Sequence, residues 1–145
     1  MPEKGKFINK GTIIVDTGGT GINITSYCRC TGGYIYLNAG ATGITVGAED
    51  NTTRRRIYIN DIQISGFKSG GGESSQKGDP NTYGIKMLAS TSYYNCYCEL
   101  KNVSIYGLYH GMVGNMRASL IDVQIEQCYD NLTINGSHNH IRITG

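Results

Sequence analysis

Short runs in which apolar and polar residues alternate recur along most of this chain. The run Ile13–Val15 is followed nine residues later by Ile22–Ile24, and Ile35–Leu37 is followed at the same spacing by Ile44–Val46. A period of two is typical of a strand with one buried face, whereas an amphipathic helix repeats every 3.6 residues. The alternation therefore predicts short β-strands rather than helices.

These runs come in pairs, and the pairs repeat. The first run of each pair begins at Ile13, Ile35, Ile62, Val103, Val123 and Ile141. The second run begins at Ile22, Ile44, Ile85, Met112 and Leu132. The two runs start nine residues apart in four pairs and 23 residues apart in the pair that begins at Ile62. The 14 extra residues (23 minus 9) are rich in Gly and Ser, and they predict an exposed inserted loop at about 68–82.

A third extended piece, such as Ile57–Ile59, Cys96–Leu100 or Leu120, precedes several of the pairs. Three short strands in each repeat of roughly 20 residues predict an all-β, single-stranded parallel β-helix of about five to six coils. General crossover chirality favours the right-handed form. We expect residues 1–11 to form an N-terminal lead-in or cap and residues 12–145 to form the β-helix, as a fragment of a longer chain. A β-sandwich is the alternative architecture.

The residue before each second run is usually small or turn-forming. These residues are Gly21, Gly43, Gly84, Gly111 and Asn131. Gly and Asn tolerate the left-handed backbone region that a sharp corner requires. We therefore expect left-handed conformations at these five positions.

Composition and charge narrow the possible partners. The 145 residues include 21 Gly and 11 Tyr, and the formal net charge is only +2. This charge is too small to indicate nucleic acid or an anionic membrane as a partner, and no apolar run is long enough to span a bilayer. The first residues lack the apolar stretch of a signal peptide, so we expect no export by that route.

The five cysteines include two C-x-C pairs, Cys28/Cys30 and Cys96/Cys98, together with Cys128. An odd number argues against a complete disulfide framework, and zinc-finger spacing is missing. In an extended run both thiols of a C-x-C pair point to one face, so we expect them to pack inward in a reducing compartment. No metal or other cofactor is predicted.

The repeat also predicts columns of outward-facing side chains. One column contains Thr12, Tyr34, Asp61, Asn102, Asp122 and His140. The next contains Ile14, Tyr36, Gln63, Ser104, Gln124 and Arg142. The third contains Asp16, Asn38, Ser65, Tyr106, Glu126 and Thr144. Neighbours in a column are expected about 4.8 Å apart, and such a face of tyrosines, amides and acids suits the binding of sugars.

The segments Asn60–Gly66, Asn102–Gly107 and Asp122–Glu126 resemble right-handed β-helix proteins of the pectate-lyase-like superfamily. The segment Asn131–Ser137, followed by Ile141–Gly145, is similar to the same pattern. That superfamily includes polysaccharide lyases, polygalacturonase-type hydrolases and the tailspikes and appendages of bacteriophages. The resemblance covers residues 12–145 and implies an architecture rather than one activity.

From this resemblance we expect a structural and adhesive segment of a phage tailspike, fibre or appendage. We expect it in the virion after synthesis in the host cytoplasm, as a homotrimer that contacts other virion proteins and a bacterial surface polysaccharide. The expected sugar-binding residues are Tyr106, Asp122, Gln124, Glu126, His140 and Arg142. The alternatives are a polysaccharide lyase or glycoside hydrolase of the same superfamily and a non-enzymatic bacterial scaffold.

If the chain is an enzyme, the candidate catalytic residues are Asp122, Glu126 and Arg142. Glycoside hydrolysis needs two carboxyl groups roughly 5 to 9.5 Å apart. Asp122 and Glu126 are four residues apart on one extended strand, which places them about 13 Å from one another. The expected spacing therefore favours binding over catalysis.

Overall fold

The computed structural model describes residues 5–25, 27–47, 55–67, 76, 78–88, 96–114, 117–134 and 140–145. Among these residues the regular secondary structure is entirely β-strand. The strands are β1 (Gly5–Ile8), β2 (Thr12–Val15), β3 (Thr20–Ile24), β4 (Cys28–Thr31), β5 (Tyr34–Leu37), β6 (Thr42–Val46), β7 (Arg55–Ser65), β8 (Tyr83–Met87), β9 (Cys96–Tyr106), β10 (His110–Gly114), β11 (Arg117–Glu126), β12 (Asp130–Ile134) and β13 (His140–Thr144).

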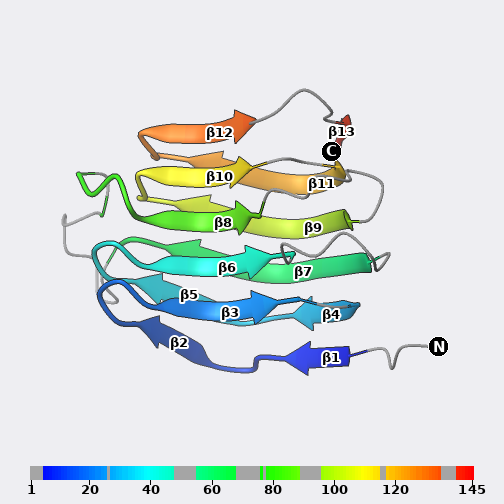
Figure 1. Ribbon diagram of the computed structural model, residues 1–145, viewed down its shortest axis with the longest axis horizontal. Helices are drawn as coiled ribbons and strands as arrows, with labels where there is room; N and C mark the ends of the chain where they lie inside the picture. The colour runs from blue at the N-terminus through cyan, green and yellow to red at the C-terminus, as the bar shows by residue number, and fades with distance from the viewer. Residues whose placement is uncertain are drawn as a thin grey trace.

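The strands form two sheets, one in front of the other in Figure 1. The five-stranded sheet has the order β12-β10-β8-β6-β3. The eight-stranded sheet has the order β1-β4-β7-β9-β11-β13, with β5 pairing with β7 and β2 pairing with β5. All of these strand pairs are parallel. The prediction of an all-β fold with parallel strands is therefore confirmed.

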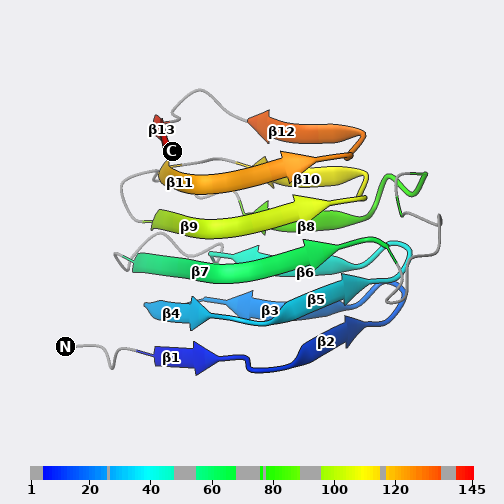
Figure 2. The ribbon, with the colours of Figure 1, turned by 180° about the vertical axis from the view of Figure 1, so that it is seen from behind.

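The chain passes back and forth between the two sheets as it advances from one end of the stack to the other (Figures 1 and 2). The predicted second runs form the five-stranded sheet in the expected register. Ile22 pairs with Ile44, Ile44 with Ile85, Ile85 with Met112 and Met112 with Leu132. The spacing in the sequence thus correctly identified which residues lie above one another in this sheet.

The long strands β7, β9 and β11 each contain two halves. The first halves, residues 55–60, 96–101 and 117–121, lie in line with β1, β4 and β13. The second halves, residues 62–65, 103–106 and 123–126, lie in line with β2 and β5. The predicted third extended piece is therefore the first half of a strand that continues into the first run of the next pair.

A left-handed residue separates the two halves of each long strand. Asp61, Asn102 and Asp122 have φ values of 56°, 53° and 51°. Where the sheet is interrupted between β4 and β5, Gly32 and Gly33 have φ values of 86° and 83°. Gly accepts this region without steric cost, and Asp and Asn are the non-Gly residues that tolerate it best. The bend thus falls where the sequence supplies these residue types.

Two predicted pairings in the eight-stranded sheet are wrong. Ile35 pairs with Ile64 rather than with Ile62. The first half of β7 sets this register. Cys28 of β4 pairs with Ile57, and six residues further along each segment Tyr34 lies opposite Gln63. Ile141 pairs with Ala118 rather than with Val123, because β13 lies on the first half of β11.

The hydrophobic core lies between the sheets and draws on both. Its largest fully buried side chains are Ile35, Ile44, Ile57, Ile59, Ile62, Ile64, Ile85, Leu100, Ile105, Leu108 and Met112. At about 25 cal/mol per Å² of apolar surface, each such side chain contributes roughly 1.5–3 kcal/mol of transfer free energy. Repeated isoleucines thus hold the two sheets together at each level of the stack.

The structure corrects the explanation given for the corner glycines. Gly21, Gly43, Gly84 and Gly111 do not adopt left-handed backbone conformations, and neither does Asn131. The glycines are needed for space. A Cβ on Gly84 would lie 2.5 Å from the Gly111 carbonyl oxygen and 2.6 Å from Ile105 Cγ2. A Cβ on Gly43 would likewise lie 2.6 Å from the Gly84 carbonyl oxygen.

Two segments bear on the expected boundaries. Residues 5–8 lie within the expected lead-in, and they form β1, which pairs with β4. Most of the predicted loop, residues 68–75 and 77, lies outside the described residues. At its end, Thr82 is fully buried, and its hydroxyl accepts a hydrogen bond of 2.9 Å from the Gly40 amide.

We expect Gly84→Ala to lower the free energy of unfolding by about 1–3 kcal/mol, because the new methyl group overpacks the corner. Urea unfolding measures this change. Gly78→Ala is the matched control, since a Cβ at this exposed glycine would have no atom within 4 Å. Equal unfolding midpoints for the two variants would contradict the close-approach explanation.

Candidate functional site

The candidate site is the outward face of the second halves of β7, β9 and β11, together with β2 and β5. Alternation along these strands buries Ile62, Ile64, Val103 and Ile105 and turns the residues between them outward. Strand pairing then aligns the outward residues in columns. One column is Thr12, Tyr34, Gln63, Ser104 and Gln124, and the next is Ile14, Tyr36, Ser65, Tyr106 and Glu126. Ser65 is the exception to the predicted outward exposure, because it is buried.

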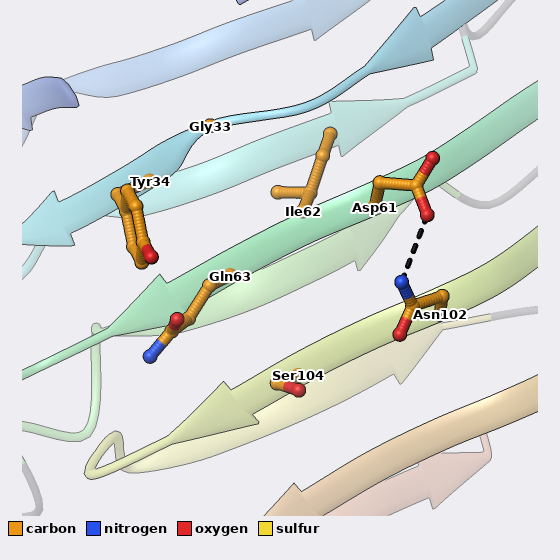
Figure 3. Close-up of a pocket in the computed structure, with 7 residues that line it drawn as sticks. All are labelled: Gly33, Tyr34, Asp61, Ile62, Gln63, Asn102 and Ser104. Carbon is orange, nitrogen blue, oxygen red and sulfur yellow. Dashed lines mark hydrogen bonds between the residues drawn. The ribbon is translucent and has the colours of Figure 1, made fainter. Parts of the chain in front are cut away.

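A shallow hollow of about 220 Å³ opens on this face. Its lining consists of Gly33, Tyr34, Asp61, Ile62, Gln63, Asn102 and Ser104 (Figure 3). Figure 3 shows Tyr34, Gln63 and Ser104 following one another across three neighbouring strands. The hollow therefore presents a phenol ring, an amide and a hydroxyl in sequence.

The bend supplies the polar edge of the hollow. Asn102 Nδ2 donates a hydrogen bond of 2.8 Å to Asp61 Oδ1 (Figure 3). Both side chains are exposed, and both residues have the left-handed backbone described above. Because the bond uses one oxygen of Asp61, the second oxygen is available to accept a hydrogen bond from a ligand hydroxyl.

Aromatic rings border the hollow on the next column. The rings of Tyr34 and Tyr36 are stacked, with centroids 6.4 Å apart and an interplanar angle of 7°. Tyr106 lies further along the same face, with its ring 5.9 Å from that of Phe67. Partial burial raises the pKa of the Tyr106 phenol, although a hydrogen bond with Ser65 acts in the opposite direction. Tyr106 therefore stays a neutral hydrogen-bonding group at physiological pH.

The structure brings together four of the six predicted sugar-binding residues. Glu126 pairs with Tyr106, Gln124 pairs with Ser104, and Asp122 lies at the bend of the same strand. Arg142 instead pairs with Ser119 on the first half of β11, so its expected place beside Gln124 is wrong. His140 pairs with Arg117 rather than lying beside Asp122, and its side chain is outside the described residues.

The acids of this face are Asp61, Asp122 and Glu126, and all three are exposed. Asp122 and Glu126 both lie on β11 with three residues between them. Glu126 belongs to the column that contains Tyr106. Asp61 and Asp122 lie on β7 and β11, with Asn102 of β9 between them in the stack. Within the described part of the chain, no group of three or more His, Cys, Asp or Glu side chains could hold a metal ion.

A second cluster was missed by the sequence analysis. It lies where the strands of the five-stranded sheet begin. Tyr83, His110 and Asp130 are the first residues of β8, β10 and β12, and they lie opposite one another on these neighbouring strands. The rings of Tyr83 and His110 stack at 4.8 Å and 9°, and His110 Nδ1 lies 3.4 Å from Asp130 Oδ2 without hydrogen-bond geometry. The available signal was positional, since each of these residues directly precedes a corner Gly or Asn.

Two tyrosines extend this second cluster toward solvent. Tyr109 and Tyr129 directly precede His110 and Asp130, and their rings stack at 4.5 Å. Tyr129 is 67% exposed. Desolvation and the neighbouring Tyr129 and Asp130 raise the pKa of Tyr109. The Lys86 Nζ atom lies over the ring of Tyr83, 4.6 Å from its centroid. The cluster is thus an aromatic surface with one carboxylate and one ammonium group beside it.

The comparisons with known proteins give no family: no protein-family model, curated protein or solved structure matches the chain. Among the described residues, no helix is long and apolar enough to cross a membrane.

The cysteines that the structure describes largely face the core. Cys30 and Cys98 are fully buried, which confirms inward packing for one thiol of each C-x-C pair. Cys28 and Cys128 are partly buried, and the side chain of Cys96 lies outside the described residues. Burial, aided by the nearby Cys28 thiol, raises the pKa of Cys30 to about 12. Cys30 is therefore an unreactive apolar group.

We expect iodoacetamide at pH 8 to label Cys28 in the folded protein much faster than Cys30, because only a thiolate reacts. Trypsin separates the two residues at Arg29, so mass spectrometry can compare them. Unfolding in urea should equalise the two rates. Folding stability should also fall as the pH rises above 9.0, the ordinary pKa of a thiol, since only the unfolded thiol then ionises. Equal labelling of the folded protein would contradict the inward placement of Cys30.

Proposed function

We propose that this chain is a stretch of right-handed parallel β-helix that binds a carbohydrate as a structural and adhesive part of a phage tailspike, fibre or appendage. The β-helix is supported by the strictly parallel pairing and by the regular passage of the chain between two sheets. Right-handed crossovers are the strong general preference for parallel strands.

The single observation that carries the carbohydrate proposal is the hollow lined by Tyr34, Gln63 and Ser104 with the Asp61–Asn102 pair at its edge. Stacked aromatic rings offer apolar faces to the C–H groups of a pyranose. Amide, hydroxyl and carboxylate groups recognise its hydroxyls through hydrogen bonds. The columns extend this chemistry along several strands, as binding of a linear chain of sugars requires.

Adhesion rather than cleavage is supported by the positions of the acids. Asp122 and Glu126 lie about 13 Å apart on an extended strand, beyond the separations that glycosidases use. A polysaccharide lyase or glycoside hydrolase of the same β-helix class remains the competing proposal. Release of new reducing ends from a bound polysaccharide, abolished by Glu126→Gln, would replace adhesion with that activity.

A homotrimer is supported by exposed apolar side chains near the N-terminal end of the stack. Ile14 is 68% exposed and Ile8 is 50% exposed, and both lie on the first strands of the stack, β2 and β1. Exposed apolar groups that lie together usually mark an interface. We propose that this end packs against neighbouring subunits of a homotrimer and against other virion proteins.

Binding can be measured on an array of purified bacterial capsular and O-antigen polysaccharides, followed by calorimetry on the strongest neutral ligand. We expect Gln63→Ala to weaken that binding about tenfold, which corresponds to the loss of a hydrogen bond to a sugar hydroxyl. Thr45→Ala, at an outward position of the five-stranded sheet, is the control and should bind normally. No binding to any polysaccharide, or equal loss in both variants, would contradict the proposal.

Light scattering tests the trimer. We expect a mass about three times the 15.8 kDa of one chain. Ile14→Lys should shift the protein toward monomers because it places a charge in the apolar contact. Asn23→Lys adds the same charge at an exposed position of β3 and should leave the mass unchanged. A monomer at high protein concentration would overturn the trimer.

A further inference from the structure

The first half of the eight-stranded sheet carries a band of exposed basic side chains. The strands β1, β4, β7, β9, β11 and β13 lie next to one another in this half, at the left of Figure 2. Each of the six contributes one exposed cation whose side chain the structure describes. These cations are Lys6, Arg29, Arg56, Lys101, Arg117 and Arg142, and together we call them the cation band.

Strand alternation directs the whole cation band away from the core. On β4, Cys30 is fully buried beside the exposed Arg29, and on β11, Leu120 is buried two residues before the bend at Asp122. Pairing places Lys6 directly opposite Arg29. The six cations therefore share the outward surface of this half of the sheet.

The cation band has one cation on each strand, at three positions along the strands. Six neighbouring strands about 4.8 Å apart extend over about 24 Å, with one cation at each level. Arg56 and Arg117 share one position along the strands. Lys6, Arg29 and Arg142 lie two residues further along, and Lys101 lies two residues beyond these, each step being about 6.6 Å. The positive charge is therefore spread over a surface about 24 Å long in the direction of the stack and about 13 Å wide along the strands.

Few negative charges offset the cation band. Among the described residues of this half, Glu99 is the one acid, and no ion pair joins it to a cation of the band. Arg29 lies over the ring of Tyr58 at 5.1 Å, and the Tyr97 hydroxyl donates a 2.8 Å hydrogen bond to Ser119 Oγ. The band is thus a group of cations among hydrogen-bonding and aromatic groups.

We propose that the cation band binds a linear acidic polysaccharide lying along the stack, with its carboxylate or sulfate groups on successive strands. This site extends the proposed carbohydrate function to a face separate from the hollow. The partly buried rings of Tyr58 and Tyr97 offer little surface for base stacking. The acids Asp61, Asp122 and Glu126 on the adjoining half would repel a wide polyanion such as duplex nucleic acid.

The test uses alginate and carboxyl-reduced alginate, which share a backbone and differ in charge. The whole chain should bind alginate, with an affinity that falls as salt is added, and should bind the reduced polymer at least tenfold more weakly. The double variant Arg56→Gln/Arg117→Gln should weaken alginate binding about tenfold. Lys10→Gln/Lys86→Gln removes the same charge outside the band and should change the affinity less than twofold.

Other outcomes would overturn the proposal. Equal affinity for the two polymers would exclude recognition of charge. Equal losses of affinity in the two double variants would show that alginate binding depends on net charge alone and not on the cation band. Tighter binding of oligodeoxythymidine than of alginate would assign the band to single-stranded nucleic acid. Gln63→Ala should leave alginate binding unchanged, so failure at the band and failure at the hollow can be told apart.

Discussion

Parallel in-register pairing of neighbouring strands is the constraint on which the rest of this structure depends. Each residue lies about 4.8 Å from its counterpart one strand away, so similar residues form columns through the stack. Inward columns of isoleucine make the core, and outward columns make continuous surfaces. A single repeated pattern thus determines both the stability of the molecule and the length of any surface that a polymer could occupy.

Two backbone requirements give this stack its shape. Gly43 and Gly84 are needed because a Cβ at either position would lie only 2.6 Å or 2.5 Å from a carbonyl oxygen of the next strand. Asp61, Asn102 and Asp122 supply the left-handed residue at which a long strand bends. The bend also places polar side chains at the edge of the hollow, so residues that shape the sheet contribute to its candidate site.

The bend divides the eight-stranded sheet into two surfaces of opposite character. The second half carries tyrosines, amides and the acids Asp61, Asp122 and Glu126, whereas the first half carries the cation band. The net charge of +2 conceals this division because the two contributions largely cancel. A partner on the first half of the sheet therefore meets a different chemistry from a partner on the second half. We propose that both surfaces bind extended sugars.

The sequence by itself determined the strand period, the parallel all-β fold, the complete register of the five-stranded sheet and the inward placement of Cys30 and Cys98. It also identified four residues that share the candidate face. The pairings of Ile35 and Arg142 were decided only by the tertiary structure. A slip of two residues leaves every side chain on its own face, so the alternating pattern cannot distinguish Ile62 from Ile64 as a partner. The pairing of the segments that come directly before, Cys28 with Ile57, makes that choice.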